Sequence, residues 1–211
     1  MILTVLSIVG SVAFGVSGAI VAMEEDYDIF GILVLGLITA FAGGMIRNLI
    51  VGLPMVAVWH QTGAFIAVLS AVGLTVLLPR RWVKWGWELM VYFDALGLST
   101  FAVEGALYAE HIHVPIGTVM VAAVMTGAGG GVVRDVLAQR KPMVFRSDTY
   151  AVWALLAGAV VALHGISPRV AWQVYAVMAG IFVLRVLSVV FGWHLPRVAV
   201  FGQGKPNTID Q

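Results

Sequence analysis

Two ten-residue stretches, 87 positions apart, decide the fold of this chain: Thr39-Ala40-Phe41-Ala42-Gly43-Gly44-Met45-Ile46-Arg47-Asn48 and Thr126-Gly127-Ala128-Gly129-Gly130-Gly131-Val132-Val133-Arg134-Asp135. Each places a cluster of glycines, followed by an arginine, inside apolar sequence. The same offset maps residues 14–19 (FGVSGA) onto 101–106 (FAVEGA), and one more residue of offset maps 54–56 (PMV) onto 142–144 (PMV). The chain is therefore an internal duplication. A duplicated glycine break followed by an intramembrane charge is typical of proteins that pass a polar solute or ion across a membrane.

The composition indicates a membrane protein with several spans. Of the 211 residues, 61% are hydrophobic and 11% are charged, whereas a soluble domain carries roughly 25% charged residues. The net charge of +1, without any run of like charges, argues against nucleic acid as a partner. The absence of cysteine excludes disulfides and thiolate metal sites, and nothing in the sequence calls for a cofactor or a resident metal.

Seven segments are long and apolar enough to cross a bilayer, which takes about 20 residues. The first is expected to be a retained span, because no Lys or Arg precedes Arg47 and because part of it recurs in the second copy. The seven predicted spans are residues 2–23, 29–51, 62–79, 87–108, 114–138, 149–166 and 170–193.

Each copy of the duplication holds three spans, and an odd number of spans forces the two copies into opposite orientations. The sequence therefore predicts an all-α membrane protein of seven transmembrane helices, built as an inverted 3+3 repeat with a seventh helix appended. The expected units are 1–86, the first three-helix repeat; 87–166, the inverted second repeat; 167–196, the seventh helix; and 197–211, a flexible cytoplasmic tail.

The loop charges predict the orientation. In a seven-span arrangement only Arg169 falls in a loop on one side, and the other loop and tail Lys and Arg fall on the opposite side. Because cytoplasmic loops carry the excess of Lys and Arg, we expect a multi-pass cell-membrane protein with its N-terminus outside and its C-terminus in the cytoplasm. The residues on the basic side are Arg80, Arg81, Lys84, Arg140, Lys141, Arg146, Arg197 and Lys205.

Three arginines and three acids fall within the predicted spans. An arginine at the centre of a helix costs ~2.5–3.5 kcal/mol even on the insertion scale, so these groups should face protein or water. The equal numbers suggest at least partial pairing, and the sequence does not say who pairs with whom. The alternative to a role in a path is that these charges are ion-pair struts that hold helix register. The six residues are Arg47, Arg134, Arg185, Asp94, Glu104 and Asp135.

The glycine clusters, Gly43-Gly44 and Gly129-Gly130-Gly131, lie in the middle of their spans. Glycine lets a helix kink and free backbone carbonyls, which can act as cation ligands where they line a watery cavity. The alternative is close helix packing, which also selects small residues. The polar residues expected beside these kinks are Ser17, Thr39, Arg47, Asn48, Asp94, Glu104, Thr126, Arg134 and Asp135. We predict that they line or gate the path.

An enzymatic function is not expected. Ser17 lies among glycines, as the nucleophile of a membrane-embedded serine protease does, but that chemistry needs a base within hydrogen-bond reach. All five histidines fall in loops or at the ends of predicted spans. The glycine-rich run follows no strand, so it is not a phosphate loop.

At these residues the chain resembles the prokaryotic trimeric intracellular cation (TRIC) channels. The resemblance rests on the duplicated Ser/Glu-Gly-Ala and Gly-Gly-x-x-Arg elements and on residues 94–98 (DALGL), and it covers the chain from Phe14 to about Pro196. It implies a homotrimer in a lipid membrane, with one pore per protomer that is permeable to K⁺ and less selectively to Na⁺. It also implies that the second and fifth spans bend at the glycine clusters. Ala42, Asn48 and Glu104 depart from the family pattern, in place of a glycine, an aspartate and a small polar residue.

The alternative function is a secondary transporter for a small neutral amino acid such as glycine, because the resembling family has also been catalogued as glycine transporters. Inverted repeats and broken helices are equally typical of secondary transporters. A zwitterion needs a positive and a negative group close together, and Arg134 with Asp135 or Glu104 would serve.

Overall fold

The computed structural model describes residues 2–77, 86–146 and 149–193, and these form helices joined by short loops. The helices are α1 (Ile2–Glu24), α2 (Ile29–Val51), the 3-10 turn η1 (Met55–Val58), α3 (Thr62–Val76), α4 (Gly86–His111), α5 (Ile116–Leu137), the short α6 (Met143–Arg146), α7 (Tyr150–His164) and α8 (Ala171–Val190). The prediction of an all-helical membrane fold is confirmed. The predicted loop 80–84, the last two residues of the span 62–79 and the predicted tail 197–211 lie outside the described residues.

The helices that match the predicted spans differ in length. Helices α1, α2, α4, α5 and α8 are long and apolar enough to cross a membrane. Helices α3 and α7 contain 15 residues each, which is roughly 22 Å at 1.5 Å per residue, against a hydrocarbon core of about 30 Å. The third and sixth spans are therefore shorter than predicted in the described part of the chain.

Local sequence sets where the helices begin and end. The Asp28 side chain accepts a hydrogen bond from the Gly31 amide at 2.7 Å and caps the start of α2, which satisfies one of the free amides of the first turn. Gly52 caps the C-terminal end of α2 and Gly165 that of α7, and their φ angles of 74° and 56° are left-handed. Glycine takes this conformation without steric cost. The chain therefore turns back at these ends.

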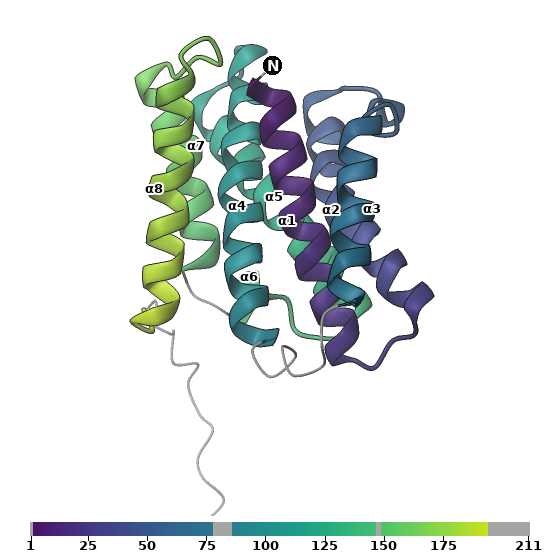
Figure 1. The fold of residues 1–211 in the computed structure, drawn as a ribbon. Helices are drawn as coiled ribbons and strands as arrows, with labels where there is room; N and C mark the ends of the chain where they lie inside the picture. The colour runs from purple at the N-terminus through teal and green to yellow at the C-terminus, as the bar shows by residue number, and fades with distance from the viewer. Residues whose placement is uncertain (1, 78–85, 147–148, 194–211) are drawn as a thin grey trace, which may run out of the picture.

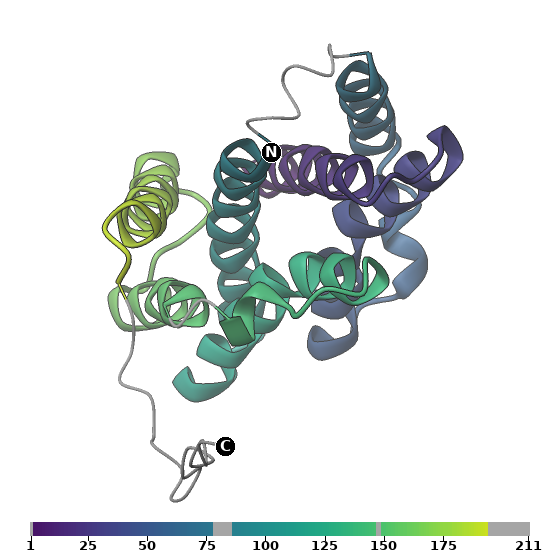
Figure 2. The same cartoon turned by 90° about the horizontal axis from the view of Figure 1, so that it is seen from below.

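Four helices form the centre of the molecule. Helices α1, α2, α5 and α4 pack against one another in that cyclic order, as the view along the bundle shows (Figure 2). Helix α3 packs on α1 and α2, its repeat counterpart α7 packs on α4 and α5, and α8 packs on α4 and α7. Helices α1 and α4 lie side by side and run in opposite directions (Figure 1). This is the arrangement that an inverted repeat requires.

A group of ion pairs ties the two repeats together at the end of the bundle where α1 finishes. The Arg140 guanidinium donates to Glu24 at 2.8 Å and also to Glu25. The Tyr27 hydroxyl donates to the Leu137 carbonyl at 3.1 Å. The loop between α1 and α2 is thereby held against the end of α5.

Candidate functional site: two buried arginine clusters

The two repeats meet where α1 crosses α4. The rings of Phe14 and Phe101, which are counterparts in the duplication, lie 5.5 Å apart between centroids. A methyl group added at Gly10 would lie 2.6 Å from the Phe101 ring, and one added at Gly97 would lie 2.8 Å from the Phe14 ring. Each phenylalanine thus fits against a glycine of the opposite helix, and the pair fills the centre of the four-helix group.

The glycine clusters lie where α2 crosses α5. A methyl group at Gly43 would lie 2.7 Å from the Thr126 carbonyl oxygen, and one at Gly130 would lie 2.7 Å from the Thr39 carbonyl oxygen. Both helices continue without interruption through these glycines. In this conformation Gly43 and Gly130 permit close packing of one backbone on another, as small residues do at membrane helix contacts. A broken helix at either cluster is absent from these two described helices.

The predicted path residues Thr39 and Thr126 pack against α1 and α4. A methyl group at Gly18 would lie 2.6 Å from the Thr39 hydroxyl oxygen, and one at Gly105 would lie 2.5 Å from that of Thr126. The Thr39 hydroxyl donates to the Leu35 carbonyl at 2.6 Å, one turn back in α2. These two threonines therefore hold the α1–α2 and α4–α5 contacts in equivalent positions.

Arg134, from α5, is at the centre of the first buried cluster, which we name the Arg134 cluster: Ser17, Asp94, Arg134 and Asp135. Its guanidinium lies 2.7 Å from the Asp94 carboxylate and 2.8 Å from that of Asp135, and it also donates to the Ser17 hydroxyl. The Arg134 side chain has an exposed fraction of 0%. One arginine here joins α5 to both α4 and α1, and it faces two carboxylates.

Arg47, from α2, is at the centre of the second, which we name the Arg47 cluster: Ser7, Arg47, Asn48 and Glu104. The guanidinium lies 2.5 Å from Glu104, and it donates to the Asn48 side-chain oxygen at 3.1 and 3.2 Å. The Ser7 hydroxyl donates to the same Glu104 oxygen. The guanidinium also lies over the Tyr108 ring, 4.4 Å from its centroid. This arginine faces one carboxylate and one amide.

The two clusters are related by the duplication, but the acid and the serine occupy exchanged positions in the repeat. In the Arg134 cluster α4 supplies the acid, Asp94, and α1 supplies the serine, Ser17. In the Arg47 cluster α4 again supplies the acid, Glu104, at the position equivalent to Ser17, and Ser7 is the equivalent of Asp94. Each cluster therefore contains one serine and one acid that α4 supplies, and both of these acids belong to the second repeat. The clusters share a geometry and differ in charge.

The residue after each arginine anchors the next loop. The Asn48 amide donates to the Pro54 carbonyl at 3.1 Å. The Asp135 carboxylate accepts from the Met143 amide at 2.9 Å. Both of these segments carry the duplicated Pro-Met-Val sequence, so the residue after each arginine bonds to the backbone of an equivalent segment of its own repeat.

The remaining glycines of the clusters have unequal surroundings. A methyl group at Gly44 would meet only the Arg47 guanidinium, at 3.8 Å. At Gly131, the equivalent position, it would lie 3.0 Å from the Tyr150 hydroxyl and 3.2 Å from Asp94. At Gly129 it would lie 2.6 Å from the Ile46 side chain. The space beside the second cluster of glycines is thus filled by side chains, and the space beside Gly44 is open.

All nine polar residues predicted from the sequence for the path are buried, with exposed fractions of 0–3%. The structure gathers most of them into the two clusters and places Thr39 and Thr126 between them. Three further residues of these surroundings, Ser7, Tyr108 and Tyr150, were not predicted from the sequence. Applying the 87-residue offset to Asp94 leads to Ser7, whereas nothing in the sequence distinguishes the two tyrosines from other aromatic residues of the spans.

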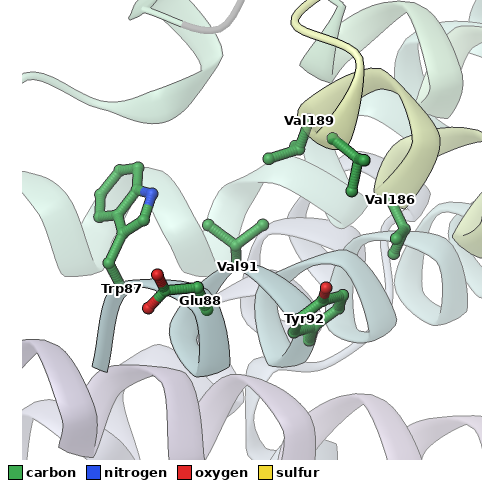
Figure 3. A pocket seen from close by; sticks show the side chains of 7 residues that line it. Trp87, Glu88, Val91, Tyr92, Val186 and Val189 are labelled. Atoms are coloured by element: carbon green, nitrogen blue, oxygen red, sulfur yellow. The ribbon is translucent and has the colours of Figure 1, made fainter. Parts of the chain in front are cut away.

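Among the described residues, two hollows lie outside these clusters. One, of about 200 Å³, lies between α4 and α8, where Val186 and Val189 stand opposite Trp87, Val91 and Tyr92 (Figure 3). The other, of about 440 Å³, is apolar and is lined by α2, α3 and α5, including Phe41, Met45 and Val133. Neither is lined by a predicted path residue, and the ion pairs are closed off from both.

The fold and these clusters define a multi-pass membrane protein with a duplicated core that buries charge at its centre. Comparison with known proteins shows which family of membrane proteins the chain belongs to. The family model described as "Glycine transporter" matches residues 4–80 and 91–165. The chain is 46% identical to the UPF0126 membrane protein YvgT of Bacillus subtilis (strain 168), over 91% of this chain and 94% of that protein. It is 33% identical to the UPF0126 inner membrane protein YadS of Escherichia coli (strain K12), over 95% and 98%.

Solved structures show the same fold. A prokaryotic TRIC channel crystallised in 0.5 M KCl matches with a TM-score of 0.83 and 32% identity, over 92% of this chain and 99% of that chain. The TRIC channel orthologue from Rhodobacter sphaeroides matches with a TM-score of 0.78 and 29% identity, over 90% and 98%. The chain belongs to the family that this "Glycine transporter" model describes, and the resemblance to the prokaryotic TRIC channels is confirmed. Its relatives in these comparisons are channels and membrane proteins, and the similarity supports a cation channel.

Proposed function

We propose that this protein conducts monovalent cations, K⁺ and less selectively Na⁺, along a path between α1, α2, α4 and α5 of each protomer. The observation that carries the proposal is the pair of buried arginine clusters, each formed by residues of both repeats around one arginine of each repeat, beside the Phe14–Phe101 contact. Functional sites in inverted repeats lie near the midplane at the interface of the halves. Similar solved structures of TRIC cation channels support the same function.

The proposed path is closed in this conformation. Both arginines and their acids, Glu104 and Asp94, are 0–3% exposed, so a hydrated ion has no room beside them. Opening requires the arginines to separate from these acids, and the phenylalanines to move apart. Once separated, each acid attracts a cation and each arginine limits how tightly the ion is held. Conduction needs sites that an ion can leave as well as enter.

The finer features follow from the resemblance to TRIC channels and remain part of the proposal. Bending of α2 and α5 at Gly43-Gly44 and at residues 129–131 would widen the path, because these positions lack the Cβ atoms that would resist it. We further propose a homotrimer in the cell membrane, with its N-terminus outside and its C-terminus in the cytoplasm. Chemical cross-linking in native membranes tests the trimer.

Recording from purified protein tests conduction. In a planar bilayer with a K⁺ gradient, we expect unitary current steps that reverse near the K⁺ equilibrium potential and persist with Na⁺. A membrane without current steps from monodisperse protein would contradict the proposal. Protein denatured before reconstitution is the control for leak.

A transporter for glycine is the second candidate, and the description of the matching family model favours it. The Arg134 cluster has the groups that a zwitterion needs, since Arg134 can bind a carboxylate and Asp94 an ammonium. Saturable uptake of radiolabelled glycine into proteoliposomes, without unitary currents, would establish this alternative and exclude the channel.

A further inference from the structure

Tyr108 lies against the Arg47 cluster, and its counterpart in the duplication is not aromatic. The Arg47 guanidinium lies over the Tyr108 ring, 4.4 Å from its centroid. A cation within about 6 Å of an aromatic centroid is attracted by the negative face of the ring. The 87-residue offset relates Tyr108 to Val21, a residue without a ring. This contact is therefore a feature of one repeat that the duplication does not copy into the other.

A second difference between the repeats accompanies this ring. Arg134 is followed by Asp135, whose carboxylate lies 2.8 Å from the guanidinium. Arg47 is followed by Asn48, whose side-chain oxygen accepts from the guanidinium at 3.1 and 3.2 Å. An ionised acceptor binds a guanidinium more strongly than a neutral acceptor does. The arginine that lacks a second carboxylate is thus the one that lies over the Tyr108 ring, and the ring supplies part of the missing attraction.

Tyr108 and Glu104 lie one turn apart on the same face of α4. Glu104 is fully buried, whereas Tyr108 is half-buried and lies nearer the C-terminal end of the helix. The Arg47 guanidinium contacts both, at 2.5 Å from the carboxylate and 4.4 Å from the centroid of the ring. A shift of the guanidinium toward the end of α4 therefore lengthens the ion pair and keeps the contact with the ring.

Open space adjoins the Arg47 guanidinium. Within the described part of the chain, a methyl group at Gly44 would meet only this guanidinium, at 3.8 Å. At Gly131, the equivalent glycine beside Arg134, a methyl group would lie 3.0 Å from the Tyr150 hydroxyl and 3.2 Å from Asp94. Side chains fill the space beside Arg134, so Arg47 is the arginine that can change position with less rearrangement.

Glu104 keeps a hydrogen bond when Arg47 moves away. Its Oε1 atom accepts from the Ser7 hydroxyl as well as from Arg47. Its Oε2 atom is buried and has no hydrogen-bond partner among the described residues. A buried charge without a counter-charge is strongly unfavourable. The carboxylate that Arg47 leaves is therefore held in place by Ser7 and attracts a cation to replace the guanidinium.

We propose that Tyr108 is a positioning residue of the path: its ring holds the Arg47 guanidinium after the ion pair with Glu104 has opened, and so leaves the carboxylate to a passing cation. This proposal rests on the proposed channel function. While the ion pair is closed, the ring adds to the attraction of an acid that balances the arginine. Once the pair has opened, the ring is the main partner that α4 offers the guanidinium. The ring therefore stabilises the open conformation more than the closed one, which is the condition for shifting their populations.

The first test is the contact between Arg47 and Tyr108, and it does not depend on ion conduction. Thermal unfolding of the purified protein in detergent is measured for Tyr108→Leu, Arg47→Met and the double variant. We expect the double change to lower the midpoint by clearly less than the sum of the single changes, because residues in contact are not additive. Strict additivity overturns the proposal.

A ring-keeping variant decides the same question if Arg47→Met does not fold. Tyr108→Phe keeps the aromatic face and should unfold near the wild-type midpoint, whereas Tyr108→Leu should unfold at a lower temperature. An equal loss in the two variants overturns the contact.

The second test is the role in opening, measured as the open probability of K⁺ currents in planar bilayers. We expect Tyr108→Leu to lower the open probability about fivefold, within the usual range of coupling between sites, and Tyr108→Phe to keep the wild-type value. In the Arg47→Met background, Tyr108→Leu should have no further effect. Tyr92→Leu is the matched control: the same change on the same helix, at an exposed residue that faces α8, should leave the open probability unchanged.

The outcomes separate the two proposals. An unchanged or raised open probability in folded Tyr108→Leu, or an equal loss in Tyr108→Phe, overturns the role of Tyr108 while the channel stands. If the wild-type protein conducts no ions, the channel proposal fails and the role in opening fails with it. The unfolding cycle alone then decides whether Tyr108 binds Arg47.

Discussion

Replacing Gly130 with alanine should destabilise the protein, whereas the same change at Gly44 should not. The new methyl group at Gly130 would lie 2.7 Å from the Thr39 carbonyl oxygen and 3.1 Å from the Phe14 ring. Because the nearest atom belongs to the backbone, the clash is relieved only by moving α2 away from α5. At Gly44 the nearest atom is the end of the flexible Arg47 side chain, at 3.8 Å. Both glycines lie inside helices, so the comparison isolates packing.

The magnitudes follow from two opposing effects. Overpacking of a close contact costs about 1–3 kcal/mol. Alanine in place of glycine in a helix gains up to about 1 kcal/mol. The net loss at Gly130 is therefore up to about 2 kcal/mol, which corresponds to roughly 4–8 °C in the unfolding midpoint by the scaling for domains of this size. At Gly44 the midpoint should stay the same or rise.

Thermal unfolding in detergent, followed by loss of the monodisperse peak on size exclusion, measures both variants against the wild type. Gly43→Ala should behave like Gly130→Ala, because its methyl group would lie 2.7 Å from the Thr126 carbonyl oxygen. Equal midpoints for Gly44→Ala and Gly130→Ala would refute the reasoning. So would a stabilised Gly130→Ala variant, since that result means the glycine is needed for bending and not for packing.

Three further predictions concern the charges and the crossing. Glu104→Gln leaves Arg47 buried without its acid and should lower the free energy of unfolding by about 3–5 kcal/mol, the usual effect of breaking a buried ion pair. The control Ser7→Ala removes one hydrogen bond to Glu104 and should lower it by only about 1 kcal/mol. Equal unfolding midpoints for the two variants would contradict the pairing of Arg47 with Glu104. Arg140→Gln removes the partly exposed ion pairs to Glu24 and Glu25 and should lower the free energy of unfolding by no more than about 1 kcal/mol. The difference in unfolding midpoint from the wild type should shrink in high salt, and a difference that does not depend on salt would argue against these ion pairs. Phe14→Ala opens space at the α1–α4 crossing and should raise the unitary K⁺ conductance. It should also lower the free energy of unfolding by about 3–5 kcal/mol. Unchanged conductance in planar bilayers would place the path elsewhere.

The sequence predicts the helices and the duplication well, because both depend on local patterns. An apolar run of sufficient length has few alternatives to a membrane helix, and the 87-residue offset identified Arg47 with Arg134 and Ser17 with Glu104. The same offset relates Asp94 to Ser7, but Ser7 was not predicted as a site residue, because no repeated residues beside it mark that match. The partners of each arginine depend on which helix faces which, and the spacing of residues within a helix carries no information on that.

The role of the glycines could not be settled from the sequence either. A glycine that permits bending and a glycine that permits close approach look the same in the chain. The structure distinguishes Gly43 and Gly130, which face a backbone carbonyl, from Gly44, which has open space. The expected bends therefore remain a proposal, and the close crossing of α2 and α5 is the observed use of the glycines in this conformation.

The measurement that tests the central claim most directly is chemical modification of the path during K⁺ current recording. The chain contains no cysteine, so Ser17→Cys introduces a single thiol at a position that is 0% exposed and touches Arg134. We predict that a cationic methanethiosulfonate reagent reaches this thiol while the channel opens and reduces the current irreversibly, whereas Ile112→Cys, on an exposed loop residue, is modified without loss of current. A current that continues unchanged after mass spectrometry has shown Ser17→Cys to be modified would contradict a path through the Arg134 cluster.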